Sequence, residues 1–271
     1  MTKRKQTRQR KKQNRLLIGI IITLLVLLFG INIFTIYQAW KTQQNRTEDT
    51  SRDIKNEKVT PAEPVSLEEP EETVPQKIDF QALWAINTDA YAFIEIPGTQ
   101  VYYPVMQSSI QEENYYLNVT FEKVAGLPGS IFTQMINAKD FLDPITIIYG
   151  HDMLDGSYFG ELKNYIDRAF FDTHREIYIY LPDRQLRYEI IAEVVFDDSY
   201  IPEILDIKNP ASVPEFMNQI VAIPEPQNQF AEGAIIQEED KLIVLSTCIG
   251  DRPDHRRIIV AKLADDKKTE Y

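Results

Sequence analysis

"VLSTCIGDRPDHRRIIVAKL", residues 244–263, contains the only cysteine of this 271-residue chain. An apolar run ends in Ser246-Thr247-Cys248, a polar loop follows, and a second apolar run begins at a pair of arginines. Runs rich in Ile and Val between turn residues are typical of β-strands. A lone cysteine is usually a buried packing residue, which favours an inert thiol. Its position at a strand end beside a polar loop favours a functional group instead.

The same strand-like pattern recurs through the C-terminal part of the chain. Apolar runs punctuated by turns lie at residues 92–98, 101–106, 129–134, 144–150, 176–182, 186–196, 241–248 and 257–263. Helical spacing is expected at 78–87, where Asp79 is a plausible N-cap, and at 159–172 and 209–223. About eight strands with inserted helices predict one mainly antiparallel barrel or sandwich rather than a βαβ fold.

The N-terminus predicts a membrane anchor. Residues 1–15 carry eight Lys/Arg and no acidic residue, and residues 16–37 are 22 residues without a charge. A helix of that length spans a bilayer core of about 30 Å, and the basic flank stays in the cytoplasm. A cleaved signal peptide fits less well, because its apolar core is usually about 7–15 residues and no small-residue cleavage site follows.

These features divide the chain into four predicted segments. Residues 1–15 form a basic cytoplasmic tail and residues 16–40 a transmembrane signal anchor. Residues 41–77, which are polar and Pro-containing, form an extracellular stalk. Residues 78–271 form the extracellular folded domain. The expected location is therefore the cell membrane, with a single pass and the N-terminus in the cytoplasm.

Charge and cysteine content restrict the function. The chain has 29 basic and 41 acidic residues, a net charge of −12. Without the basic tail, 21 basic residues face 41 acidic ones, a net charge of −20. Such an acidic domain argues against a nucleic-acid partner. A single cysteine forms no intramolecular disulfide.

A reactive thiol needs an activating partner, and the chain has three histidines. His174 lies in a charged segment and is expected to be a solvated surface residue. His255 lies in the same loop as Cys248, where an ordinary polar surface role is the simpler explanation. His151 follows the run 144–149 and Gly150, so it begins a loop after a strand, as Cys248 does. Adjacent strands would bring the two together, which gives His151 a modest preference over His255.

Arg256 and Arg257 are candidates for oxyanion stabilisation. A guanidinium offers permanently charged donors to the oxyanion that develops during acyl transfer. Neighbouring side chains of a strand face opposite ways, so only one of the two points toward Cys248. Periodicity does not choose between them.

At this point the residues resemble a sortase, specifically of class B. "LSTC" (245–248), followed eight residues later by Arg256 in "RRIIVA", is similar to the sortase pattern of Leu-x-Thr-Cys, a loop, and Arg-x-apolar-apolar-x-Ala. Further similar segments are "IIYGHDMLDGSYFGELKNYID" (147–167), "FIEIPGTQVYYPVMQ" (93–107), "NYYLNVTF" (114–121) and "GSIF" (129–132). The resemblance extends over residues 83–263. The order and spacing of these motifs make it specific.

The resemblance implies a closed β-barrel and a cysteine transpeptidase on the outer face of a Gram-positive membrane. Such an enzyme cleaves the C-terminal sorting signal of a secreted protein. It then joins the new acyl end to an amino group of a cell-wall precursor or to a pilin lysine. Cys248 corresponds to the nucleophile, His151 to the general acid/base and Arg256 to the oxyanion-stabilising or substrate-positioning group. The resemblance implies no cofactor or metal.

Three further residues are candidates for substrate contacts. Ser246 and Thr247 precede the cysteine, and Asn118 resembles a groove residue of the family. Each would equally satisfy strand-end hydrogen bonds.

Other functions share some of these residues. A class B sortase that polymerises pilins, or an extracellular cysteine peptidase with water as acceptor, would use the same thiol and imidazole. A membrane-anchored binding domain would have Cys248 merely packed.

Overall fold

The computed structural model describes residues 73–108, 110 and 112–270. The predicted tail, the predicted anchor at 16–40 and most of the predicted stalk therefore lie outside the described residues. Among the helices that the structure describes, none has the length and apolar character needed to cross a bilayer.

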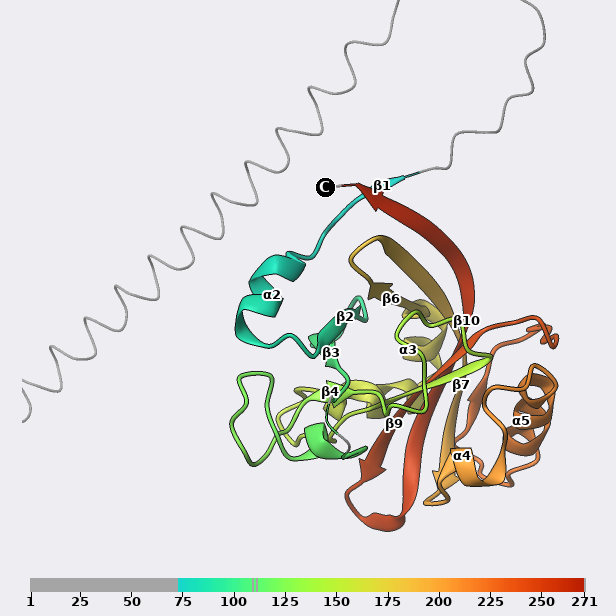
Figure 1. Ribbon diagram of the computed structural model, residues 1–271. Helices are drawn as coiled ribbons and strands as arrows, with labels where there is room; N and C mark the ends of the chain where they lie inside the picture. The colour runs from blue at the N-terminus through green and yellow to red at the C-terminus, as the bar shows by residue number, and fades with distance from the viewer. Residues whose placement is uncertain (1–72, 109, 111, 271) are drawn as a thin grey trace, which may run out of the picture. The chain divides into compact units, whose positions relative to one another are not determined.

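Eight strands close into a barrel (Figure 1). Their order around the barrel is β10, β9, β5, β4, β3, β2, β6 and β7, and pairing of β7 with β10 closes the ring. Most pairings are antiparallel, while β3–β4 and β5–β9 are parallel. The strands are β2 (Ala90–Glu95), β3 (Tyr102–Met106), β4 (Ile131–Phe132), β5 (Ile145–Tyr149), β6 (Glu176–Tyr180), β7 (Arg184–Asp197), β9 (Leu242–Ile249) and β10 (Arg252–Glu270). The predicted barrel of about eight strands is confirmed.

Two short strands and one strand extension were not predicted. β1 (Val74–Pro75) pairs with the end of β10, and β8 (Gln229–Phe230) pairs with β7. Two-residue strands carry too little pattern to be recognised. The last residues of β10 are charged rather than apolar, and they pair with β7 through ion pairs such as Arg187–Asp265. β1 shows that folded structure begins ahead of residue 78.

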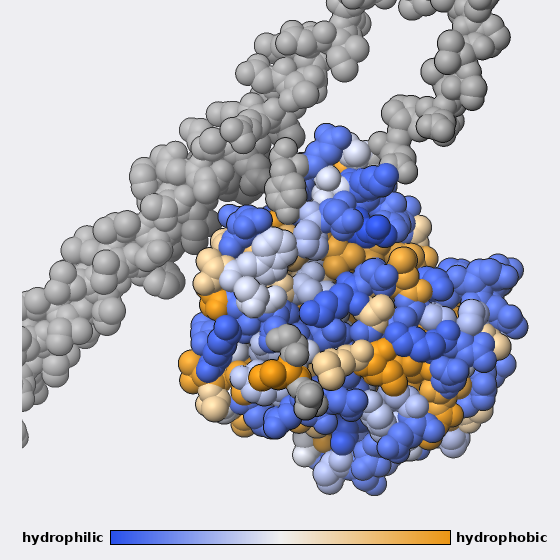
Figure 2. All heavy atoms as spheres, in the orientation of Figure 1, coloured by the Kyte–Doolittle hydropathy of each residue, from blue (hydrophilic) through white to orange (hydrophobic). Residues whose placement is uncertain are grey.

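The two faces of the barrel wall carry separate cores. The alternation along β10 directs Ile259 and Ala261 into the barrel interior, and Ile258 and Val260 outward. The outward side chains pack against helices α4 (Ile201–Ile204) and α5 (Ser212–Val221). The face seen in Figure 2 is mostly hydrophilic, with hydrophobic groups between the hydrophilic ones. The first half of β9 and the adjoining part of β10 are thus buried on both faces, which makes their register well specified.

The predicted helices are confirmed with changes in detail. Asp79 caps α2 (Phe80–Ile86) by accepting from the Ala82 N–H at 3.0 Å. α5 lies within the predicted 209–223, with Pro214 in its first turn, where no hydrogen-bond donor is needed.

The predicted helix at 159–172 is divided into two. The 3₁₀ helix η2 (Gly160–Ile166) ends at Asp167, whose backbone is extended. The Asp167 side chain then caps α3 (Arg168–Thr173) through the Phe170 N–H. Asp167 therefore lies between the two helices, where its side chain has the capping role that Asp commonly has at a helix N-terminus. The short η1 (Tyr115–Leu117) and α4 were not predicted.

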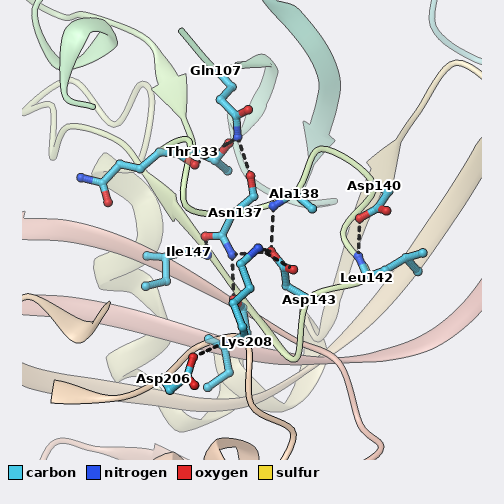
Figure 3. A network of polar contacts seen from close by, with 12 residues as sticks. Gln107, Thr133, Asn137, Ala138, Asp140, Leu142, Asp143, Ile147, Asp206 and Lys208 are labelled. Carbon is cyan, nitrogen blue, oxygen red and sulfur yellow. Dashed lines mark hydrogen bonds and ion pairs between the residues drawn. The ribbon is translucent and has the colours of Figure 1, made fainter. Parts of the chain in front are cut away.

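A buried polar network fixes the start of β5 (Figure 3). Asn137 donates to the Ile145 carbonyl at 2.9 Å and accepts from the Ile147 N–H at 3.0 Å. It also donates to Asp143, which accepts from Lys208 at 2.7 Å. Burial acts to raise the pKa of Asp143, but hydrogen bonds from Asn137, Lys208 and the Ala138 N–H outweigh it and lower that pKa. This carboxylate therefore stabilises the fold above its ordinary pKa, and the contribution is lost as the pH falls through the lowered value.

We expect Asn137→Ala to lower the free energy of unfolding by roughly 2–4 kcal/mol, because two buried backbone groups of β5 lose their partner. Urea unfolding followed by circular dichroism measures the change. Lys208→Ala is the control: its side chain is 45% exposed, so we expect a loss of about 1 kcal/mol or less. Equal losses in the two variants would contradict this role of Asn137.

Candidate active site

A groove of about 440 Å³ lies where β5, β9 and β10 meet the segments around η1 and α4. Cys248, His151 and Arg256 all line it. His151 and Arg256 are more than 90 positions apart in the sequence, and three strands of one barrel wall bring the three residues together.

Cys248 lies near the end of β9 and is exposed. It is directly opposite Arg256 in the antiparallel β9–β10 pairing. Residues opposite one another in such a pairing have Cα atoms about 5 Å apart and side chains on the same face. The register therefore places a guanidinium beside the thiol.

His151 reaches the same point from the parallel neighbour of β9. Tyr149 is level with Ser246, and the Gly150 N–H donates to the Ser246 carbonyl at 3.2 Å. His151 is two residues beyond Tyr149, and Cys248 is two residues beyond Ser246. The two residues therefore lie at the same end of two adjacent parallel strands. Gly150 lies between Tyr149 and His151, and its φ is not positive. A Cβ there would lie 2.4 Å from Ile131 Cδ1, so close packing requires the glycine.

The imidazole of His151 is held by a backbone carbonyl. Its Nε2 lies 2.8 Å from the Leu117 oxygen. A carbonyl only accepts, so Nε2 carries the proton and Nδ1 is the nitrogen left for proton transfer. Gly129, where φ is +64°, packs closely against this carbonyl: a Cβ at that position would lie 2.3 Å from the Leu117 oxygen. Sequence reasoning did not identify this contact, because no side-chain pattern marks a backbone acceptor.

Arg256 and Arg257 have opposite orientations. Arg256 lines the groove and donates through Nη1 to the carbonyls of Pro253 and His255, both at 2.9 Å. A guanidinium has five N–H groups, so Nε and Nη2 are not used by these bonds. Arg257 is buried on the other face and pairs with Glu193. Strand alternation thus answers the question that periodicity left open: Arg256 is the arginine beside the thiol.

The Arg257–Glu193 pair lies on the interior side of the barrel wall, and both side chains are almost completely buried. Burial raises the pKa of Glu193 to about 7, although the Arg257 guanidinium opposes the shift. The cost of removing two charges from water offsets much of the attraction in such a buried pair, so the pair adds little net stability. Here the pair fixes which face of β10 each arginine occupies.

The other two histidines lie apart from the thiol. His255 does not line the groove and contacts Asp254 at 2.8 Å through Nδ1. His174 was expected to be a solvated surface residue, which is wrong. It is half-buried and stacks on Phe170 with ring centroids 4.0 Å apart, against Gly98.

Comparisons with known proteins agree on one family. No protein-family model matches the chain. Curated relatives include sortase B of Listeria monocytogenes, 28% identical over 63% of this chain and 67% of the relative, and sortase B of Staphylococcus aureus, 25% identical over 94% and 98%. A solved structure of a Streptococcus pyogenes class B sortase involved in pilus biogenesis is 31% identical, with a TM-score of 0.59, over 69% of this chain and 98% of that chain.

The chain belongs to the class B sortases. It is accordingly a sortase cysteine transpeptidase with the barrel of that family.

The remaining predicted residues of this sortase have different surroundings. Ser246 is on the same strand face as Cys248 and lines the groove. Thr247 also lines the groove, although it is largely buried and strand alternation directs its side chain to the interior beside Arg257. Asn118 is exposed and follows η1, and it is not among the lining residues. The structure therefore brings Ser246 and Thr247 to the groove and places Asn118 outside its lining.

The groove of the sortase also contains residues that sequence reasoning missed. Asn114, Gln134, Tyr149 and Tyr200 line its walls. Polar residues at the ends of apolar runs, as in "GSIFTQ", were the available signal, but such residues are common in turns. Within the described part of the chain, no cluster of His, Cys, Asp or Glu has the composition to hold a metal ion.

We expect Arg257→Met to lower the free energy of unfolding by about 3–5 kcal/mol at neutral pH, because Glu193 then has no partner. When the pKa of a carboxyl group is raised on folding, the free energy of unfolding of the protein falls as the pH rises from the unfolded-state pKa to the folded-state pKa. Without Arg257 the pKa of Glu193 rises further, so the loss is larger at about pH 8 than at about pH 6. Urea unfolding at both values measures it.

The control is the double variant Glu193→Leu/Arg257→Met, which removes both charges. We expect it to recover most of the stability and to abolish the difference between the two pH values. A pH-independent loss in Arg257→Met would contradict this account of the pair.

Proposed function

We propose that this class B sortase cleaves the C-terminal sorting signal of secreted proteins and transfers them to an amino group of a cell-wall precursor. The juxtaposition of Cys248, His151 and Arg256 in one groove is the observation that carries the proposal. We further propose that the enzyme is membrane-anchored through residues 16–40, with its catalytic domain outside the cell, as the charge pattern of the N-terminus indicates.

The first half-reaction forms an acyl-enzyme. The Cys248 thiolate attacks the scissile carbonyl, and the negative charge on the carbonyl oxygen is stabilised by donors of Arg256. Collapse of this intermediate breaks the C–N bond, and the leaving amine takes its proton from Nδ1 of protonated His151. The product is a thioester on Cys248. The bond of Nε2 to the Leu117 carbonyl holds the ring in orientation throughout.

The second half-reaction reverses these roles. An incoming amine attacks the thioester, His151 takes its proton, and the thiolate leaves as a new amide forms. Exposure of Cys248 at the groove surface gives both the peptide and the amine access to the thioester. With water as the acceptor, the same steps would make the protein a peptidase.

A second candidate function is pilin polymerisation, in which a lysine side chain is the acceptor. The similarity to a class B sortase involved in pilus biogenesis favours it. The two functions differ only in the amine, so the acceptor decides between them.

The decisive test incubates the enzyme with synthetic sorting-signal peptides and follows Cys248 by mass spectrometry. We expect an adduct with the mass of the N-terminal peptide fragment, and none in Cys248→Ala. Addition of a peptide α-amine or a lysine-bearing pilin peptide should then release a ligated product. Preferred transfer to lysine would support pilin polymerisation. Exclusive hydrolysis at saturating amine would contradict transpeptidation.

We expect His151→Ala to reduce the rate of acyl-enzyme formation by about 10²–10⁴-fold, because the leaving amine loses its proton donor. His255→Ala is the matched control, since His255 is on β10 next to Arg256 but does not line the groove. Its rate should stay close to that of the wild type. A larger loss in His255→Ala than in His151→Ala would overturn the assignment of the base.

A further inference from the structure

A chain of two hydrogen bonds links three residues that line the groove. The Tyr200 hydroxyl donates to Gln134 Oε1 at 2.8 Å, and Gln134 Nε2 donates to Asn114 Oδ1 at 2.9 Å. All three residues line the groove that contains Cys248. One amide therefore joins the two opposite walls.

Gln134 is well suited to hold its partners in place. It is 4% exposed, and its backbone oxygen accepts from Gln107 Nε2 at 3.0 Å and from the Asn137 N–H at 3.1 Å. Asn114 and Tyr200 are more exposed and precede η1 and α4, respectively. Neither belongs to a barrel strand, so no strand pairing sets the distance between these walls.

The side chains of both partners are directed to Gln134. Asn114 occupies the N-cap position of η1, where Asn commonly caps the helix, yet its side chain makes no capping bond. Burial raises the pKa of Tyr200, with Glu113 and Glu203 adding to the effect. The hydroxyl thus remains a donor at neutral pH.

We propose that Gln134 is a positioning residue for the peptide substrate, because its amide clasps the Tyr200 and Asn114 walls and fixes the width of the groove between them. The inference rests on the proposed function. The clasp acts on binding rather than on chemistry, because the catalytic imidazole is held independently. Tyr116, in the middle of η1, donates to Asp89 at 2.8 Å and anchors the segment that presents the Leu117 carbonyl to His151.

The experiment compares Gln134→Leu with the wild type in transfer of a sorting-signal peptide to saturating amine. We expect KM for the peptide to rise about tenfold, the effect of one or two lost hydrogen bonds, with kcat close to the wild-type value. Tyr200→Phe removes one of the two bonds and should raise KM about threefold. The double variant should be no worse than Gln134→Leu alone, because the lost bond is shared.

Tyr178→Phe is the matched control, since its hydroxyl contacts Glu176 on β6, outside the groove. It should leave both constants unchanged. Thermal melting shows whether each variant is folded. If Gln134→Leu does not fold, Tyr200→Phe provides the same comparison of KM and kcat.

Three outcomes would overturn the proposed role of Gln134. They are an unchanged KM in Gln134→Leu and Tyr200→Phe, a decrease in kcat with no change in KM, or additive increases in KM in the double variant. Failure of the wild-type enzyme to form an acyl-enzyme with any sorting-signal peptide would instead overturn the proposed function, and the clasp with it. The wild-type reaction therefore distinguishes the two failures.

Discussion

The register between β9 and β10 is the constraint on which the catalytic arrangement depends. It places Cys248 opposite Arg256 and directs both side chains to the groove. A slip of one residue would turn Arg256 into the barrel and bring Arg257 to the thiol. The fold resists such a slip, because the wall carries an apolar core on each face and Arg257 is paired with Glu193 inside.

The parallel pairing of β5 with β9 adds the third group. Parallel strands run in the same direction, so their carboxyl ends meet at one edge, and His151 and Cys248 emerge there together. Gly150 permits the close packing of Ile131 and Phe159 just before the histidine. The network around Asn137 anchors the start of the same strand. The position of the imidazole thus depends on packing along the whole of β5.

The groove combines barrel strands with segments that lie outside the barrel ladders. Its floor consists of barrel strands, whose ladders fix the reacting groups. Its walls are formed by η1 and the segment before α4, which join through side chains rather than through ladders. The walls and the reacting groups are held by different contacts, because Gln134 joins the walls while strand register places the thiol, imidazole and guanidinium.

The sequence by itself determined the strands of the barrel, the strand-end positions of Cys248 and His151, and the family, because apolar periodicity and short motifs are local properties. It did not determine that η2 and α3 are separate, that β10 continues through charged residues, or that His174 is stacked on Phe170. Tertiary structure alone decided which carbonyl orients His151 and that Gln134 joins the groove walls. It also gave the physical reason why Arg256, the arginine to which the family resemblance points, is the one beside the thiol. These are contacts between segments distant in the chain, and their geometry follows from strand register and closure of the barrel, which no local pattern encodes.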